Sequence, residues 1–337
     1  MNDGTFEPFM IPPVVHNAQG EVRRAGFELE YSGVTITDSA LLIREVFGGT
    51  HVVESTFEHR VANTPFGDFT VEIDTKFLKD KKYEAPLRAL GVNAAPTDTG
   101  WLERALLGVL STVVPIEVAA PPIPIDQLAA LDELRRRLHV AGAKGTRASV
   151  FYAFGMHINP GIVSDDPAEL LNTLRAFILL YPWLKRESEV DLTRSMSPYI
   201  DRFPSQYGRL ILRPDYRVTR ERLIDDFLQH NPTRNRPLDM LPVLTHLDPQ
   251  RVRRNVPDMS LVKPRPSFHY RLPNCMIDEP QWTLAAEWNR WVVVERLAND
   301  PRRIADMSRD YQAAEAQSFK PFYEKWPDVL EQYMKSA

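Results

Sequence analysis

The sequence predicts an α+β fold, in which helices cover one face of a curved and largely antiparallel sheet. Segments with alternating apolar and polar residues recur along the chain, as expected for strands with one buried face. The turn sequence Thr64-Pro65-Phe66-Gly67 separates two of these segments and favours an antiparallel hairpin. Amphipathic stretches with helical spacing lie among the strands, so both kinds of element are mixed along the chain.

The first half of the chain is expected to form most of the sheet. One helix in this half would be capped by Thr37, Asp38 or Ser39 and would end at Gly48-Gly49. The expected elements are an irregular leader at 1–22, strands at 23–31, 52–61, 69–77, 116–119 and 149–159, and helices at 37–47, 100–113 and 126–140.

The second half is expected to begin with a long helix at 166–185, after which the residue composition changes. Prolines and arginines become frequent over 191–264, which predicts a loop-rich insertion with one short helix near 220–230. A strand at 266–272, a helix at 282–298 and helices near 301–317 and 318–334 are expected to follow. We therefore predict a single domain over 23–298, with C-terminal helices of 299–337 packed on it.

Composition excludes several classes of protein. The chain has 337 residues, of which 43% are hydrophobic, enough for a substantial core. Its net charge of -4 argues against a general nucleic-acid or membrane-surface binder. Cys275 is the one cysteine, so no internal disulfide can form. We expect a cytoplasmic protein, because we find no signal peptide and no transmembrane run of roughly 18 apolar residues.

The strand at 23–31 places two carboxylates side by side. Residues two apart on a strand point the same way, so Glu28 and Glu30 are neighbours and Leu29 faces the opposite side. Adjacent carboxylates repel each other unless a proton or a cation intervenes. In enzymes, a divalent metal ion commonly supplies the positive charge that offsets this repulsion. A single Glu-x-Glu motif also occurs on solvent-facing strands that bind no metal.

Four further strands repeat this layout with residues that can bind metals or anions. Carboxylate oxygens with one or two imidazoles suit Mg²⁺ or Mn²⁺ better than Zn²⁺. The sequence therefore predicts a metal site on this face. The alternatives are an ordinary solvent-exposed face and, for His157, a hydrogen-bonded core residue. The residues on these strands are Glu72, Asp74, Glu117, His157, Asn159, His269 and Arg271.

Basic residues around the last strand indicate a second kind of chemistry. Lys263, Arg265 and Arg271 flank or occupy this strand. Guanidinium groups bind phosphate in a bidentate manner and keep their charge. A metal ion and arginines on one face suit phosphoryl transfer, whereas a surface salt-bridge network is the structural alternative. The chain has neither a P-loop nor a dinucleotide-binding glycine motif, so we expect neither of those nucleotide sites.

Four segments of the chain, in order, resemble the putative amidoligase family. This family is in the carboxylate–amine ligase group, which has a glutamine synthetase-like catalytic sheet, and the resemblance covers roughly residues 23 to 298. Three positions depart from the family pattern: Ala120 replaces a serine, Asn159 a histidine and His269 a glutamate. The segments are Gly26-Phe27-Glu28-Leu29-Glu30, Glu117-Val118-Ala119-Ala120-Pro121-Pro122, Gly155-Met156-His157-Ile158-Asn159 and Phe268-His269-Tyr270-Arg271-Leu272-Pro273-Asn274.

The resemblance implies an ATP-dependent ligase with Mg²⁺ or Mn²⁺, which joins an amine to a carboxylate activated as an acyl phosphate. Small molecules and peptides are equally suitable substrates. The implied metal ligands are Glu28, Glu30, Glu117 and His157. The nucleotide- and phosphate-binding residues would be Lys263, Arg265, His269 and Arg271. Catalytic roles are implied for Arg271, Glu72 and Asp74, and substrate contacts for Asn159 and Asp74.

The residues leave two other functions open. A degenerate binding or scaffold protein would keep the ligase fold without its chemistry. A metal-dependent hydrolase would use the same carboxylates and His157 to activate water without ATP. Arginines and tyrosines over 199–222 would permit RNA contact, but the acidic balance of the chain argues against nucleic acid as a partner.

Overall fold

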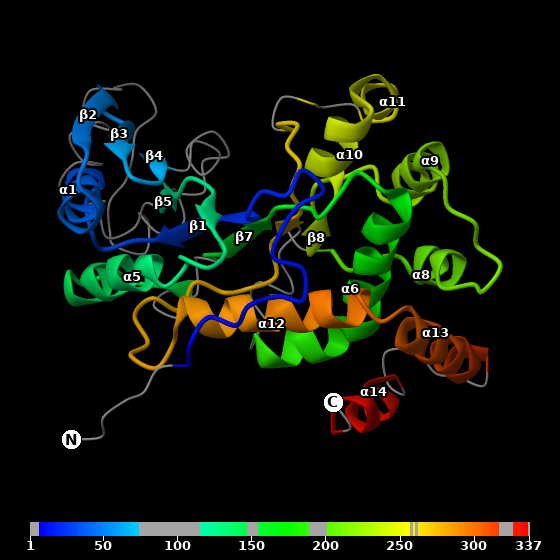
Figure 1. Cartoon of the computed structure of the whole chain (residues 1–337). Coiled ribbons are helices and arrows are strands. Elements are labelled where there is room, and N and C mark those ends of the chain that lie inside the picture. Colours follow the sequence, from blue (N-terminus) through cyan, green and yellow to red (C-terminus); the bar gives the residue numbers. More distant parts are fainter. Residues whose placement is uncertain are drawn as a thin grey trace, which may run out of the picture. The chain divides into compact units, whose positions relative to one another are not determined.

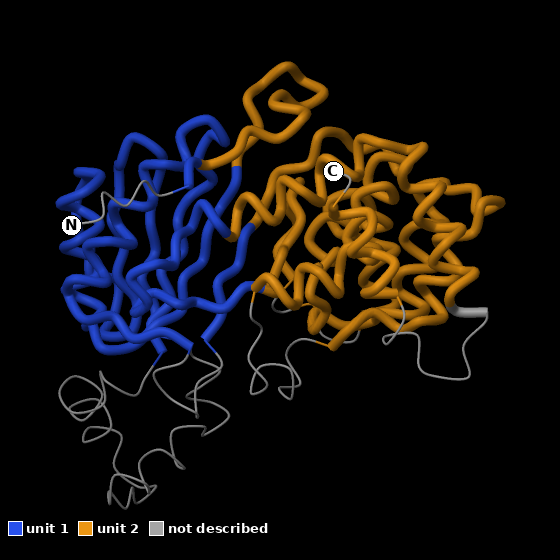
Figure 2. Tube along the Cα trace, turned by 90° about the horizontal axis from the view of Figure 1, so that it is seen from below, with its two compact units in different colours: residues 1–8, 25–158, 273–286 blue, residues 9–24, 159–272, 287–337 orange. Residues whose placement is uncertain are grey.

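The computed structural model describes residues 7–73, 115–146, 154–188, 201–256, 259, 262–316 and 326–335. The chain divides into two compact units, which Figure 2 colours separately. Unit 1 comprises residues 1–8, 25–158 and 273–286, and unit 2 comprises 9–24, 159–272 and 287–337. The helix predicted at 100–113 and the strand end at 74–77 lie outside the described residues.

Unit 1 is built on an antiparallel sheet, which agrees with the predicted α+β class (Figure 1). Its strands follow the order β2-β3-β4-β5-β1-β7, with β6 paired to β1. The bounds are β1 Arg24–Tyr31, β2 Thr50–Ser55, β3 Glu58–Thr64, β4 Gly67–Ile73, β5 Ile116–Ala119, β6 Ile123–Pro124 and β7 Met156–Pro160. Strand β7 continues from unit 1 into unit 2 after Ile158.

The apolar side of this sheet forms the core of unit 1. The register aligns Leu29, Val118 and Val71 across β1, β5 and β4, and each is at most 3% exposed. Helix α1, Ile36–Phe47, contacts β3 and β4, and its Phe47 ring stacks on Phe69 with centroids 4.7 Å apart. Burial of these side chains removes apolar surface from water and holds the polar side chains on the opposite face.

Two local predictions in unit 1 need correction. The single strand predicted over 52–61 is a hairpin, because residues 56–57 form a turn between β2 and β3. The cap of α1 is Thr35, whose hydroxyl accepts a hydrogen bond from the Asp38 backbone N–H at 3.0 Å. Helix α5, Ala130–Val140, also begins four residues later than the sequence predicts.

Unit 2 is mainly helical around a short pair of strands, β8 Leu238–Asp239 and β9 His269–Tyr270. Tyr270 packs between the aromatic rings of Phe177 and Trp291, at centroid distances of 5.7 and 5.5 Å. The helices are α6 Pro167–Glu187, α8 Ser205–Ile211, α9 Arg220–His230, α10 Leu241–Leu247, α11 Pro249–Arg253, α12 Leu284–Ala298, α13 Pro301–Ala316 and α14 Trp326–Lys335.

The segment predicted as a loop-rich insertion over 191–264 is more ordered than expected. Its described part holds four helices, α8 to α11, and strand β8, rather than one helix. These helices are short, between 5 and 11 residues, so each shows little of the periodicity on which prediction depends. The strand predicted over 266–272 is also shorter, because only His269 and Tyr270 form a ladder.

The C-terminal helix is anchored on α6 of unit 2, close to a proline inside α6. Pro182 lacks an N–H group and therefore interrupts the hydrogen-bond ladder of this helix. One turn earlier, the Leu179 carbonyl accepts a hydrogen bond of 2.8 Å from the indole N–H of Trp326. Trp326 is fully buried and begins α14, so this bond anchors the C-terminal helix on α6.

A buried ion pair fastens three segments of unit 2 together. The Arg23 guanidinium donates to both carboxylate oxygens of Glu295, at 2.8 and 2.6 Å, and to the carbonyls of Val14 and Gly161. The Trp291 indole N–H also donates to Glu295, at 2.7 Å. The two charged side chains are only 2% and 6% exposed, so their charges are compensated inside the protein.

Among the described residues, none of the helices combines the length and the apolar character required to cross a membrane.

We predict that Arg23→Ala destabilises the protein strongly, because the Glu295 carboxylate would remain buried without its cation. The expected loss is about 3–5 kcal/mol in the free energy of unfolding, measured by urea denaturation. Arg213→Ala is the control, since Arg213 is exposed and pairs with the exposed Asp215. Equal effects of the two substitutions would contradict the structural role of Arg23.

Candidate functional site

Acidic side chains form a row across four neighbouring strands of unit 1. The register pairs Glu30 of β1 with Glu117 of β5, and Glu117 with Glu72 of β4. Glu58 of β3 lies opposite Glu72 and continues the row. Directly opposed residues in antiparallel strands share one face, with Cβ atoms about 5 Å apart. Glu30, Glu117 and Glu72 are half-buried, whereas Glu58 is exposed.

Neighbouring carboxylates in this acidic row repel one another. Like charges directly opposite each other destabilise a sheet, and partial burial reduces the screening by water. Hard carboxylate oxygens are the ligands that Mg²⁺ and Mn²⁺ prefer. The sequence analysis did not place Glu58 on the acidic face, because it predicted one continuous strand over 52–61. The break in alternation around Thr56-Phe57 is the signal that could have revealed it.

His157 lies beside the same acidic face, on β7. Its Nδ1 atom is 2.9 Å from the Glu28 carboxylate, and its Nε2 atom is 3.9 Å from the Glu30 carboxylate. The Gly155 backbone N–H donates to the other Glu30 oxygen at 2.7 Å. In unit 1, the Glu28 and Glu30 carboxylates thus both approach His157, and Glu117 lies opposite Glu30 in the register. A carboxylate on one ring nitrogen is the usual support for a metal-binding histidine.

Two of the residues that depart from the family pattern contact each other in unit 2. His269 Nδ1 lies 2.6 Å from the side-chain oxygen of Asn159, and both side chains are buried. An amide oxygen can only accept, so Nδ1 of His269 carries the proton. The two residues that depart from the family pattern, Asn159 and His269, are thus hydrogen-bonded to each other.

A group of charged side chains lies on the same short ladder of unit 2. Asp239 of β8 pairs with His269 of β9 and is fully buried. Arg234 Nε lies 3.4 Å from the Asp239 carboxylate. Arg271 Nη1 donates to the Arg234 backbone carbonyl at 2.6 Å. Burial raises the pKa of Asp239, and the positive charges of Arg271 and Arg234 partly oppose this rise.

The remaining predicted residues occupy different settings. Lys263 is exposed, and Arg265 is half-buried with its backbone N–H bonded to the Pro242 carbonyl at 3.2 Å. Asp74 lies outside the described residues. Arg234 and Asp239 escaped the sequence prediction, because neither belongs to a segment with clear periodicity.

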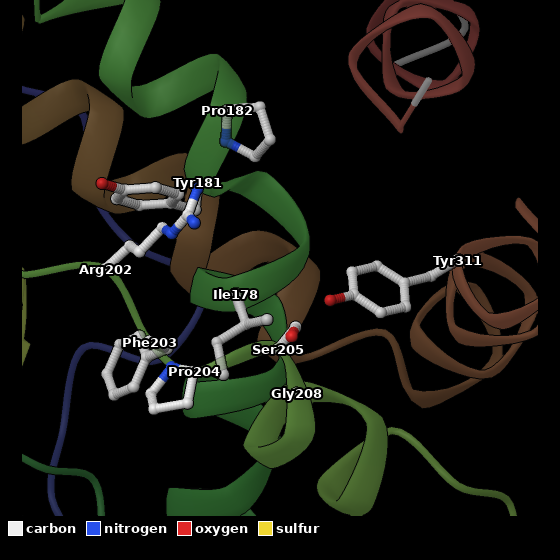
Figure 3. A pocket seen from close by; sticks show the side chains of 9 residues that line it. All are labelled: Ile178, Tyr181, Pro182, Arg202, Phe203, Pro204, Ser205, Gly208 and Tyr311. Atoms are coloured by element: carbon white, nitrogen blue, oxygen red, sulfur yellow. The ribbon is translucent and has the colours of Figure 1, made fainter. Parts of the chain in front are cut away.

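Two hollows in unit 2 are lined by residues other than Arg234, Asp239 and Arg271. The one in Figure 3 is enclosed mainly by Phe203, Tyr311 and the α6 residues Ile178, Tyr181 and Pro182. Its volume of about 20 Å³ is enough for one water molecule. A second hollow of about 240 Å³ is lined in part by Arg23 and Glu295, which form the buried ion pair of unit 2.

The fold and these side chains define a mixed α/β protein whose antiparallel sheet carries an acidic face beside a buried histidine. A family described as "Putative amidoligase enzyme" matches residues 21–293, and the chain belongs to this family. The match confirms the resemblance seen in the sequence, and the family description supports an amide-forming ligase. No curated protein matches the chain significantly.

We predict that Asp239→Asn stabilises the protein increasingly as the pH rises. The folded-state pKa of Asp239 is raised, so the wild-type protein loses stability when the pH climbs through that pKa. Asparagine does not titrate and escapes this loss. The free energy of unfolding should therefore favour the variant more at about pH 7 than at about pH 4.

The comparison uses urea unfolding of both proteins at each pH. Asp215→Asn is the control, because a hydrogen bond from Arg213 lowers the pKa of this exposed carboxyl. The difference in free energy of unfolding between Asp215→Asn and wild type should either not change with pH or change in the opposite direction. A difference between Asp239→Asn and wild type that does not change with pH would contradict the prediction.

Proposed function

We propose that the protein is an ATP-dependent ligase that joins a carboxylate to an amine through an acyl phosphate, with Mg²⁺ or Mn²⁺ as cofactor. Membership of the amidoligase family supports the formation of an amide. The single observation that carries the rest is the acidic row beside His157 on one face of the sheet. The proposal includes a glutamine synthetase-like catalytic sheet, with a small molecule or a peptide as substrate.

In this proposal Glu28, Glu30, Glu117 and His157 hold the metal ion. The donor set fits, because three carboxylates supply the hard, anionic oxygen ligands that Mg²⁺ and Mn²⁺ prefer and His157 adds one imidazole nitrogen. When bound, the ion would neutralise phosphate charge and orient the nucleotide. Glu28 has a further role, because its contact with Nδ1 fixes the orientation of the His157 ring.

The proposed reaction has two steps. An oxygen of the substrate carboxylate attacks the γ-phosphorus of ATP, the bond from this phosphorus to the β-phosphate oxygen breaks, and ADP leaves. The amine nitrogen then attacks the acyl carbon, and phosphate departs with the electron pair of the C–O bond. Glu72 or Asp74 would accept the proton that the amine loses.

Unit 2 supplies the proposed phosphate-binding groups. Arg271 would balance the charge of the phosphoryl group during transfer, with Arg265, Lys263 and His269 as further contacts. Asn159 would contact substrate, and its hydrogen bond to His269 would keep both side chains in fixed positions. Fixed donors are valuable here, because phosphoryl transfer depends mainly on positioning and charge neutralisation.

We predict that Glu28→Gln and Glu117→Gln each weaken Mn²⁺ binding by about tenfold or more, because each removes one anionic ligand. Binding can be followed by the Mn²⁺ electron paramagnetic resonance signal or by calorimetry. Glu54→Gln is the matched control, since Glu54 is exposed on β2 and pairs with Arg60. Wild-type affinity in both test variants would exclude the proposed metal site.

We predict that the wild-type enzyme releases ADP only when a divalent ion, an acid and an amine are all present. His157→Ala should lower this rate about a hundredfold or more, because charge on the phosphates would be less well stabilised. His246→Ala is the control, as His246 is exposed beside Asp165. ATP binding without turnover over a broad panel of acids and amines would instead favour the binding-protein alternative.

A further inference from the structure

Two histidines lie together on the apolar side of the sheet in unit 1. His51 of β2 and His59 of β3 come from neighbouring strands, and their ring centroids are 5.0 Å apart. The register sets His51 opposite Val61 and His59 opposite Val71, and both valines are fully buried. Opposed residues share one face of a sheet, so both imidazoles belong to the side that carries the core.

The acidic row lies on the other side of the same sheet. Glu58 and Glu72 are opposed across β3 and β4, and Glu58 directly precedes His59 in the chain. Successive side chains of a strand point to opposite faces, so Glu58 and His59 face different ways. The histidine pair, His51 and His59, is therefore separate from the carboxylates to which the proposed function assigns a metal ion.

The two rings of this pair present one nitrogen each to the other. His51 Nε2 lies 3.1 Å from His59 Nδ1. A neutral imidazole has one N–H group and one lone pair, so one ring donates to the other here. Both facing nitrogens can coordinate one ion once the shared proton moves to the other nitrogen of its own ring. With metal–nitrogen bonds of about 2.0–2.1 Å, their separation corresponds to an angle of about 100° at the metal, not far from tetrahedral.

The pair also meets two further requirements for coordination, namely a neutral imidazole and access to solvent. Burial, followed by the charge of His51, lowers the pKa of His59, so this ring is neutral at about pH 7. His59 is 5% exposed, whereas His51 is half-buried. Strand β2 lies at the end of the strand order, and Val53, which is opposite His59, is 62% exposed. An ion can therefore reach the pair from this edge and complete its coordination with water.

The hairpin holds the two rings in place before an ion binds. Strands β2 and β3 pair in register from Thr50 opposite Ala62 to Val53 opposite His59, and α1 contacts both strands. The ladder fixes the backbone on either side of each histidine. Such preorganisation lowers the entropic cost of binding.

We propose that His51 and His59 form a binding site for Zn²⁺ or a transition-metal ion with the same preference, on the side of the sheet opposite the acidic row. Imidazole nitrogen suits Zn²⁺, Cu²⁺ and Ni²⁺, whereas Mg²⁺ and Mn²⁺ prefer oxygen. The ion bridges β2 and β3, and its other positions are open to water. This inference goes beyond the proposed ligase function and does not depend on it.

The test measures Zn²⁺ binding by calorimetry on the full-length protein, in excess Mg²⁺ so that oxygen-rich sites are occupied. His51→Ala and His59→Gln should each weaken Zn²⁺ binding by about tenfold or more, because each leaves a single imidazole at the site. His246→Ala is the control and should bind Zn²⁺ as wild type does, since His246 is an exposed histidine beside Asp165. Thermal unfolding shows whether each variant is folded.

Nuclear magnetic resonance of the ¹⁵N-labelled wild-type protein tests the same site without a substitution. The imidazole nitrogen signals of His51 and His59 should shift when Zn²⁺ is added and stay in place when Mg²⁺ is added. This readout holds even if the buried His59 cannot be replaced without unfolding the protein. Unshifted ring signals would overturn the inference, and so would wild-type Zn²⁺ affinity in a folded His51→Ala variant.

A further variant separates this site from the one in the proposed function. Glu28→Gln removes a proposed ligand on the acidic side and should retain the Zn²⁺ binding that His51→Ala loses. Loss of that binding in Glu28→Gln, with no loss in His51→Ala, would assign the Zn²⁺ to the acidic side and overturn the inference.

Discussion

The arrangement of like charges across the sheet of unit 1 is the constraint on which the candidate chemistry depends. Glu30, Glu117 and Glu72 lie directly opposite one another in successive strands, although such pairs repel. The opposite side of the same strands fixes this register, because Leu29, Val118 and Val71 are almost completely buried. A slip of one residue would bury carboxylates and expose the core, so apolar packing holds the charges together.

The sequence predicts this face well because strand periodicity is short and regular. Alternation in β1 and β5 places Glu28, Glu30 and Glu117 opposite their apolar neighbours, as the structure has them. Alternation cannot show which strands are adjacent, so the pairing of Glu30 with Glu117 required the register. Glu58 was missed because the turn after Ser55 contains neither glycine nor proline, and the two strands therefore resembled one.

Unit 2 was predicted less completely for a different physical reason. Its short helices and its two-residue strands are stabilised by tertiary contacts rather than by local pattern. Asp239 and Arg234 are 5 residues apart in an irregular stretch, and only the ladder with His269 shows where the carboxylate lies. The Asn159–His269 hydrogen bond was equally hidden, since its partners are 110 residues apart. The two residues that depart from the expected family pattern are therefore in direct contact.

The two buried ion clusters of unit 2 differ in how completely their hydrogen bonds are satisfied. Around Arg23 and Glu295, backbone carbonyls and an indole N–H complete a network that closes on itself. Around Asp239, the contact with Arg234 is long, and one carboxylate oxygen makes no hydrogen bond to the described residues. Burying a carboxylate on these terms costs stability.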